Sequence, residues 1–172
     1  IGYGGYNIKY LKLHGSMNWF HCPMCQRMYV RFGEEIEMME AAYCRHCRKN
    51  YGMGEISSIK LRSNLLLPTY LKNLSNIQIK LVWQNAAIEL SEATRIVFIG
   101  YSLPSADFEI RQLLARMIRP DAKIEVVIYP YGNRVKAEVD RYKNFFGSRI
   151  AGRDIILKSV PDYVTGLRNE MK

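Results

Sequence analysis

The sequence has no long apolar segment, since its uninterrupted apolar runs reach at most about five residues. A membrane-spanning helix needs about 20 such residues, so the sequence predicts no span. No signal peptide is visible at the N-terminus, and neither internal repeats nor low-complexity segments occur. A chain of 172 residues with 48% apolar content can build a real core. It fits one domain with room for a small insert.

Acidic residues are in the minority, with 16 Asp and Glu against 25 Lys and Arg and a formal net charge of +9. If four cysteine thiolates held one zinc ion, that cluster would lower the net charge to about +7. A basic balance favours polyanionic partners such as nucleic acid, nucleotides or an acidic membrane surface. A solvated surface is the commoner reason for such charge, so this signal is weak by itself.

Cysteine occurs only four times, but in a specific pattern. Cys22 and Cys25 form one Cys-x-x-Cys pair, and Cys44 and Cys47 form a second pair after eighteen intervening residues. This spacing can place four thiolates at the corners of one tetrahedron and is typical of structural zinc. Two disulfides are the alternative, but they need an oxidising compartment. Without a visible export signal we expect a cytoplasmic protein with a zinc site.

The predicted zinc site is closed. His21 and His46 lie next to the cysteine pairs and could replace a ligand, but four thiolates already complete a tetrahedron. A closed site has no open position for substrate or water, so we expect the metal to be structural. The segment between the pairs is too short for a core of its own. We therefore predict a zinc ribbon insert at residues 21–52 that needs its metal to fold.

The rest of the chain, residues 1–20 and 53–172, alternates between strands and helices. The apolar runs that predict strands are residues 8–13, 95–100, 123–130 and 154–160. Helical periodicity is found at residues 75–93, 105–118, 133–147 and 161–172. Ser75 and Ser105 are the expected N-caps of the first two helices, and Gly147 is the expected end of the third. This alternation with short links predicts an α/β fold with a Rossmann-type parallel sheet, interrupted by the zinc ribbon.

Several residues follow directly after predicted strands: His14, Gly100, Ser102 and Tyr129. In parallel α/β sheets ligands bind beyond the carboxyl ends of the strands. Each of these residues alone is more often structural. Together, beside a zinc insert, they predict a ligand cleft.

The order of these motifs resembles the sirtuin superfamily, specifically its bacterial sirtuin-like branch. The similar parts are "LHG" at residues 13–15, the two cysteine pairs, "LLLPTYLKN" at residues 65–73, and "FIGYSL" followed by Asp107. The resemblance implies a Rossmann-type domain with an inserted zinc ribbon and an NAD site in the cleft between them.

The resemblance also implies roles for individual residues. His14 matches the histidine that acts as general base on the nicotinamide ribose, and an imidazole can accept such a proton near neutral pH. Gly100 and Ser102 match a turn that contacts the adenosine side of NAD, with Tyr101 in the position of a threonine. Tyr129 takes the place of an asparagine that contacts adenosine.

Three features depart from the family pattern. The Gly-rich phosphate loop, which precedes the catalytic histidine in the family, is absent, because "GYGG" at residues 2–5 opens no helix. The Phe-Gly-Glu segment that docks acyl peptide is missing after the second cysteine pair, and "FGE" at residues 32–34 lies inside the insert. The Ile-Asn contact appears as Ile128-Tyr129. We therefore expect a piece of a longer protein that binds NAD weakly by itself, cleaves none, and pairs with an upstream segment or a second copy.

For the intact protein the resemblance favours NAD glycohydrolase-type cleavage, which is typical of the bacterial branch. Two alternatives stay open. One is NAD-dependent protein deacylation. The other is a nucleic-acid-binding module on the basic zinc ribbon, through Arg27, Arg31, Arg45, Arg48 and Lys49. Ordinary solubility of the ribbon is the plainer explanation of those charges.

Overall fold

The structure is a computed structural model that describes residues 8–31, 42–51, 54, 58–66, 74 and 76–170. The chain divides into two compact units, Ile1–Ala86 and Ala87–Lys172. Within the described residues, no helix is both long and apolar enough to cross a membrane.

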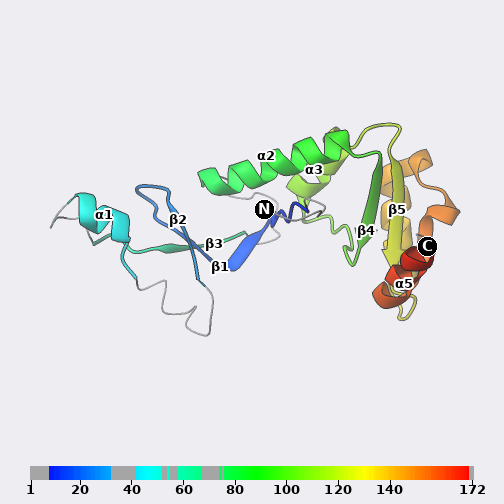
Figure 1. The fold of residues 1–172 in the computed structure, drawn as a ribbon. Helices are drawn as coiled ribbons and strands as arrows, with labels where there is room; N and C mark the ends of the chain where they lie inside the picture. The colour runs from blue at the N-terminus through cyan, green and yellow to red at the C-terminus, as the bar shows by residue number, and fades with distance from the viewer. Residues whose placement is uncertain are drawn as a thin grey trace. The chain divides into compact units, whose positions relative to one another are not determined.

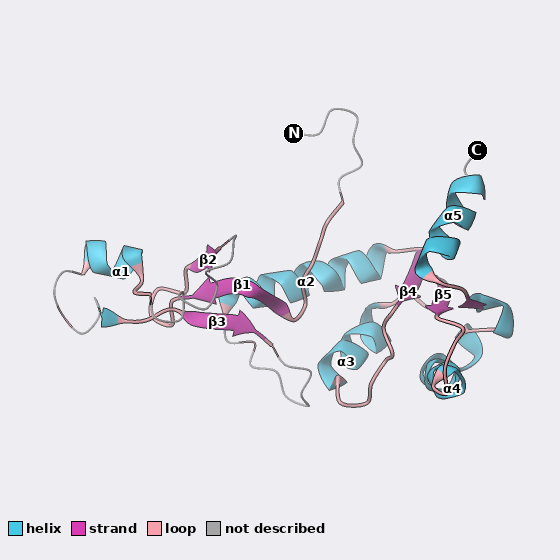
Figure 2. Cartoon of the chain, turned by 90° about the horizontal axis from the view of Figure 1, so that it is seen from below, coloured by secondary structure: helices cyan, strands magenta, loops and turns pink. Residues whose placement is uncertain are grey.

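The first unit contains a three-stranded antiparallel sheet in which β1 lies between β2 and β3 (Figure 2). The strands are β1 at Gly15–His21, β2 at Met28–Val30 and β3 at Arg62–Leu65. The short helix α1, Arg45–Asn50, carries the last of the four cysteines. Strand β1 leads into the predicted insert at residues 21–52, and β3 follows it. Because β1 and β3 pair with each other, the folded cysteine-bearing part includes residues before and after that segment.

Among the described residues, the core of this part of the first unit consists largely of cysteine. Five residues form one buried cluster, and each is at most 3% exposed: Phe20, Cys22, Cys44, Cys47 and Leu61. Only two of them are large apolar side chains. So small a core needs a cross-link such as a metal.

Helix α2, Ile77–Glu92, follows β3. The Asn76 side chain caps it, because Asn76 Oδ1 accepts hydrogen bonds from the backbone N–H groups of Gln78 and Ile79 at 3.0 and 3.3 Å. Ser75, the expected cap, lies outside the described residues. The helix itself is where its periodicity predicts it.

The second unit contains a parallel sheet in the order β4-β5-β6. Figure 1 shows β4 and β5 side by side. The strands are β4 at Arg95–Ile99, β5 at Lys123–Ile128 and β6 at Ile155–Leu157. Strand β5 pairs with both neighbours, and every residue from Ile124 to Ile128 is buried. Strand β4 is an edge of the sheet as far as the described residues extend.

Helices cover both faces of this sheet. They are α3 at Phe108–Met117, α4 at Val135–Phe146 and α5 at Val160–Glu170. Figure 2 shows α5 on one side of the sheet and α3 and α4 on the other. The Phe98 ring lies 5.4 Å from the Tyr142 ring and 5.6 Å from the Phe146 ring of α4, centroid to centroid. Burial on both faces is why the central strand is a nearly continuous apolar run.

The predicted α/β fold with a parallel sheet and a cysteine-bearing insert is confirmed. Three of the four predicted strands and all four predicted helices are present, with ends shifted by a few residues. The end of α4 at Gly147 is also confirmed, because this glycine has a left-handed φ of 57°.

The strand predicted at residues 8–13 is wrong. Residues 8–12 have no regular structure, residues 13–14 form a turn, and the strand begins at Gly15. The Gly15 N–H donates to the Lys12 carbonyl at 2.9 Å and closes the turn. His14 therefore precedes a strand rather than following one.

The cap predicted at Ser105 is also wrong. The chain turns once more before the helix, because the Asp107 N–H donates to the Pro104 carbonyl at 3.2 Å. Helix α3 then begins at Phe108, with Asp107 in the N-cap position.

Candidate metal centre and ligand-binding loops

The four cysteine sulfurs lie together, all within 4.8 Å of one another. Cys22 Sγ is 3.7 Å from Cys47 Sγ, and Cys25 Sγ is 3.6 Å from Cys44 Sγ. A disulfide would need about 2.05 Å, and all four cysteines are free. Four sulfurs about 2.3 Å from one central ion are about 3.8 Å apart, so the observed separations fit tetrahedral zinc. The chain brings all four predicted ligands to one site suited to zinc.

A backbone turn at each Cys-x-x-Cys pair directs its two thiols toward the same site. At the first pair, the Gln26 N–H donates to the Cys22 carbonyl and the Cys22 N–H to the Arg27 carbonyl, both at 3.0 Å. Gln26 has a φ of 58°, a left-handed conformation unusual for a side chain of this type. At the second pair Cys44 is the N-cap of α1, and its sulfur accepts the Cys47 N–H at 3.4 Å.

Hydrogen bonds select one thiol for deprotonation. Burial disfavours a Cys44 thiolate, but hydrogen bonds from the Tyr29 hydroxyl, at 3.1 Å, and from the Cys47 N–H outweigh it and lower the pKa of Cys44 to about 6. Burial raises the pKa of Cys47 and of Cys25. A divalent cation would supply the positive charge that lets these thiols ionise as well. The sequence did not reveal Tyr29 as a partner of this centre, because its contact with Cys44 arises only from the fold.

Neither neighbouring histidine belongs to this group of ligands. The His46 ring lies edge-on to Tyr51, with centroids 6.4 Å apart. Burial, together with the charge of Arg62, lowers the pKa of His21. The metal-binding group therefore consists of sulfur alone, the donor set that zinc prefers in closed structural sites.

His14, in the first unit, is fixed through its backbone. The Leu66 N–H donates to the His14 carbonyl at 2.8 Å, and Trp83 Nε1 donates to the Leu13 carbonyl at 2.8 Å. Gly15 has a φ of +73°, and a Cβ there would lie 1.9 Å from the Asn64 carbonyl oxygen. Only glycine fits this position, so Gly15 allows the chain next to His14 to lie close against β3.

Gly100 and Ser102 open the loop that follows β4 in the second unit. Gly100 is exposed and has a φ of +67°. Helix α4 holds this loop, because Tyr142 Oη donates to the Tyr101 carbonyl at 2.5 Å and Arg141 Nε donates to the Ser102 carbonyl at 2.8 Å. Tyr101 Oη in turn donates to the buried Asp107 carboxylate at 2.9 Å. Burial and this carboxylate raise the pKa of Tyr101.

Tyr129 follows β5, and its side chain is 62% exposed. Its ring lies 5.3 Å from that of Tyr131, which is 75% exposed. Since β4 and β5 are parallel neighbours, Gly100, Ser102 and Tyr129 lie beyond the same edge of one sheet. These three predicted residues belong to the second unit, whereas His14 belongs to the first.

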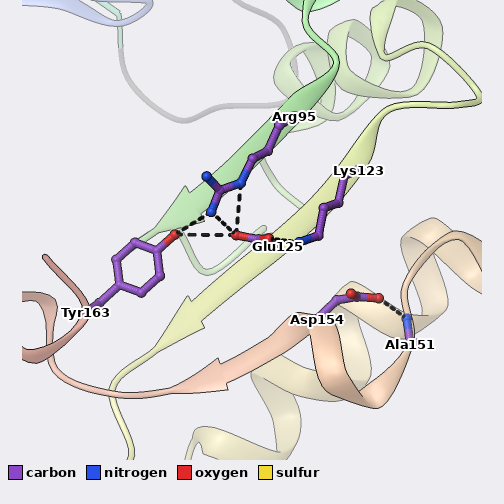
Figure 3. Close-up of polar contacts among 6 residues, drawn as sticks. All are labelled: Arg95, Lys123, Glu125, Ala151, Asp154 and Tyr163. Atoms are coloured by element: carbon purple, nitrogen blue, oxygen red, sulfur yellow. Dashed lines mark hydrogen bonds and ion pairs between the residues drawn. The ribbon is translucent and has the colours of Figure 1, made fainter. Parts of the chain in front are cut away.

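A cluster of charged and polar groups around a buried glutamate in the second unit was not predicted (Figure 3). Glu125, only 5% exposed, accepts from Arg95 Nη2 at 2.6 Å and from Lys123 Nζ at 2.5 Å, and Tyr163 Oη of α5 donates to it at 3.4 Å. The hydrogen bond from Arg95 holds the pKa of Glu125 below its ordinary value, against the effect of burial. The cluster lies at the amino ends of β4 and β5, away from the Gly100 loop. The one hint in the sequence is a lone glutamate inside the apolar run "KIEVVI".

Comparisons by sequence give no relative: no family model matches, and neither does any curated protein. Solved structures do match. A structure described as "Sir2-p53 peptide-NAD+" has a TM-score of 0.50 and 16% identity over 93% of this chain and 54% of its own. A Sir2 complex with the inhibitor EX-527, 2'-O-acetyl-ADP-ribose and deacetylated p53 peptide gives a TM-score of 0.49 and 16% identity over 93% and 55%.

The first of these two matches shows that the chain has a sirtuin-like fold, which confirms the fold that the resemblance implied. At 16% identity the likeness is one of fold alone. The chain spans about half the length of these Sir2 proteins.

Proposed function

We propose that this chain is part of a sirtuin-like, NAD-dependent enzyme of the bacterial sirtuin-like branch, whose intact form cleaves NAD between nicotinamide and ribose. The observation that carries the proposal is a sirtuin-like fold with a four-cysteine centre in one unit and a glycine-containing loop at the carboxyl edge of a parallel sheet in the other. The matching Sir2 structure is described as a complex with NAD⁺ and a p53 peptide.

His14 is the proposed general base. In the cleavage, the bond from the ribose carbon to the nicotinamide nitrogen breaks, and the ribose gains oxocarbenium character. His14 would take the proton of a ribose hydroxyl or of the attacking water as the new bond to oxygen forms. The backbone hydrogen bond at its carbonyl and the close approach of Gly15 to β3 keep its main chain in place.

The loops of the second unit would hold the adenosine end of NAD. Gly100, exposed and without a side chain, allows close approach of the ligand to the backbone. The Ser102 hydroxyl can hydrogen-bond a ribose or phosphate oxygen. The exposed Tyr129 ring offers a flat apolar surface to adenine.

Zinc takes no part in the proposed reaction. When bound to the four thiols it supplies a structural cross-link and leaves no open coordination position. Its contribution would be to hold β1, and thereby the turn at residues 13–14 that precedes it, in one conformation.

NAD cleavage without a protein substrate is favoured over deacylation because the sequence lacks the family's Phe-Gly-Glu segment after Cys47. The two activities separate in one assay. Nicotinamide release from NAD alone supports the glycohydrolase, whereas release that requires an acyl-lysine peptide supports the deacylase.

The test of the base uses the intact protein. We expect His14→Ala and His14→Gln to reduce nicotinamide release by about 10²–10⁴-fold, the usual contribution of a general base. His14→Gln keeps the polarity and approximate size of the side chain but cannot accept the proton. Zinc content and melting temperature serve as controls for folding. Full activity in both variants would remove His14 from the mechanism.

A further inference from the structure

A cavity of about 230 Å³ lies on the cysteine-bearing part of the first unit. Its lining combines apolar groups with two aromatic rings and two guanidinium groups, from Ala42, Leu61, Tyr29, Tyr43, Arg31 and Arg45. None of these residues takes part in the proposed NAD chemistry. A complete small-molecule ligand usually fills about 300–1,000 Å³, so this cavity suits one ring of a larger ligand.

The cavity is built on fixed backbone. Tyr43 pairs with Lys60 in an antiparallel bridge, and the N–H of the next residue, Cys44, donates to the Ile59 carbonyl at 3.1 Å. Arg45 directly follows Cys44, and the Tyr29 hydroxyl contacts the Cys44 sulfur at 3.1 Å. The metal centre therefore fixes the positions from which the rings and guanidinium groups extend.

Among the described residues of the first unit, every charged side chain is cationic. The described residues of the first unit include ten Lys and Arg and no Asp or Glu. Arg45, Arg48 and Lys49 of α1 are exposed, and the Arg48 guanidinium lies 5.7 Å from the centroid of the Tyr43 ring. The five glutamates of this unit fall at residues 34–40 and 55, outside the described residues, and with them the net charge of residues 1–86 is still +6.

We propose that this surface binds single-stranded nucleic acid, with one base against the Tyr43 ring and the flanking phosphates on Arg45 and its cationic neighbours. The Tyr43 ring is 42% exposed and lies beside arginine side chains. Single-strand binders use the same pairing, with aromatic stacking for the base and cations for the backbone. A duplex keeps its bases stacked and cannot offer one to the cavity. Proteins commonly bind a membrane surface through the apolar face of an amphipathic helix, whereas this site is a cavity lined by aromatic rings.

The test measures binding of the zinc-loaded 172-residue chain to fluorescently labelled single strands of ~12 nucleotides by anisotropy, at several salt concentrations. Tyr43→Ala is expected to weaken binding roughly tenfold with the salt dependence unchanged, and Tyr43→Phe, which keeps the ring, to bind as the wild type. Arg45→Gln is expected to reduce the slope of log K against log salt by about 0.7. The matched control is Arg116→Gln, which removes the same charge from an exposed position on α3 and should change the slope little.

Equal weakening by Arg45→Gln and Arg116→Gln would overturn the proposal, because binding would then follow net charge alone. Wild-type affinity in Tyr43→Ala with full zinc content would also overturn it. Equal or tighter binding to duplex DNA, or to vesicles containing phosphatidylserine, would assign the surface to that partner instead. Full competition by free AMP at micromolar concentration would show a mononucleotide site rather than a nucleic-acid site. None of these measurements depends on NAD cleavage, so this proposal and the enzymatic one can fail separately.

Discussion

The two units of the chain bury different kinds of side chain in their cores. Among its described residues near the metal centre, the first unit buries three cysteines and two large apolar side chains, Phe20 and Leu61. The second unit buries five consecutive residues of β5 and packs the Phe98 ring against two aromatic rings of α4. The first unit is thus suited to stabilisation by a metal cross-link, whereas the second relies on the burial of apolar side chains.

The two units also differ in net charge. Residues 1–86 carry a net charge of +6, and residues 87–172 carry +3 with fourteen Lys and Arg against eleven Asp and Glu. The second unit buries two of its acids, Glu125 and Asp107, and both accept hydrogen bonds. Acidic side chains thus contribute to the core of the second unit, whereas the described part of the first unit contains no acidic residue.

The largest effect is expected from Cys44→Ser, which should unfold the cysteine-bearing part of the first unit and leave the second unit folded. Four-sulfur sites of this kind bind zinc with about 10–16 kcal/mol, and much of that free energy is folding free energy. Zinc content by elemental analysis should fall below one per chain, and thermal unfolding should lose the transition of the first unit only.

Met24→Ser is the control for Cys44→Ser. It places serine inside the first cysteine pair, at a position that is 55% exposed and not among the predicted ligands. Metal content and melting should stay as in the wild type. If Cys44→Ser kept both unchanged as well, the metal centre would not stabilise this unit.

A smaller loss is expected from Gly15→Ala, measured against Gly100→Ala in the other unit. Both glycines have left-handed φ values, +73° and +67°, which cost alanine about 1–3 kcal/mol. Only Gly15 also faces a backbone oxygen, at 1.9 Å from the Cβ position, whereas Gly100 has no atom within 4 Å among the described residues. Chemical denaturation should therefore show a clearly larger loss for Gly15→Ala. Equal losses would mean that β3 moves away without cost.

The smallest effect is expected from Glu125→Gln. Removing one partner of a buried ion pair can cost 3–5 kcal/mol. Here the cationic side chains are 46% and 62% exposed, so we expect about 1–2 kcal/mol at neutral pH.

The pH dependence gives Glu125→Gln a sharper readout. Because the folded pKa of Glu125 lies below its ordinary value of 4.5, the unfolded state takes up the proton first as the pH falls. The stabilisation is complete above the ordinary value and is lost as the pH falls through the lowered one. Acid titration of the second unit should therefore be less steep in the variant. An unchanged acid profile would show that Glu125 makes no net contribution.

Much of this architecture could be predicted from local sequence pattern. The strands of the second unit are apolar runs, the helices have the 3.6-residue period, and the spacing of the four cysteines alone identifies the metal centre. The prediction failed at residues 8–13, whose alternating pattern resembles a strand. There the turn that the Gly15 N–H closes and the pairing of β1 with β3 decide the conformation, and that pairing joins residues 41 to 50 positions apart.

Side-chain partnerships could not be predicted at all. Tyr29 meets Cys44, and Glu125 meets Arg95 and Tyr163, only because strand register and helix packing bring them together. A lone glutamate in an apolar run indicates that the carboxylate has a partner in the fold. The sequence does not indicate which residue that partner is.

The central position of β5 has a consequence for measurement. Strand β5 pairs with β4 along most of its length and also with β6 over Val126–Ile128, and helices cover both of its faces. We therefore expect its backbone amides to exchange with deuterated solvent only when the whole second unit opens. The slowest amide protons of the chain should therefore lie between Ile124 and Ile128. Their exchange rates report the stability of that unit alone, without any need to remove the metal or to separate the two halves.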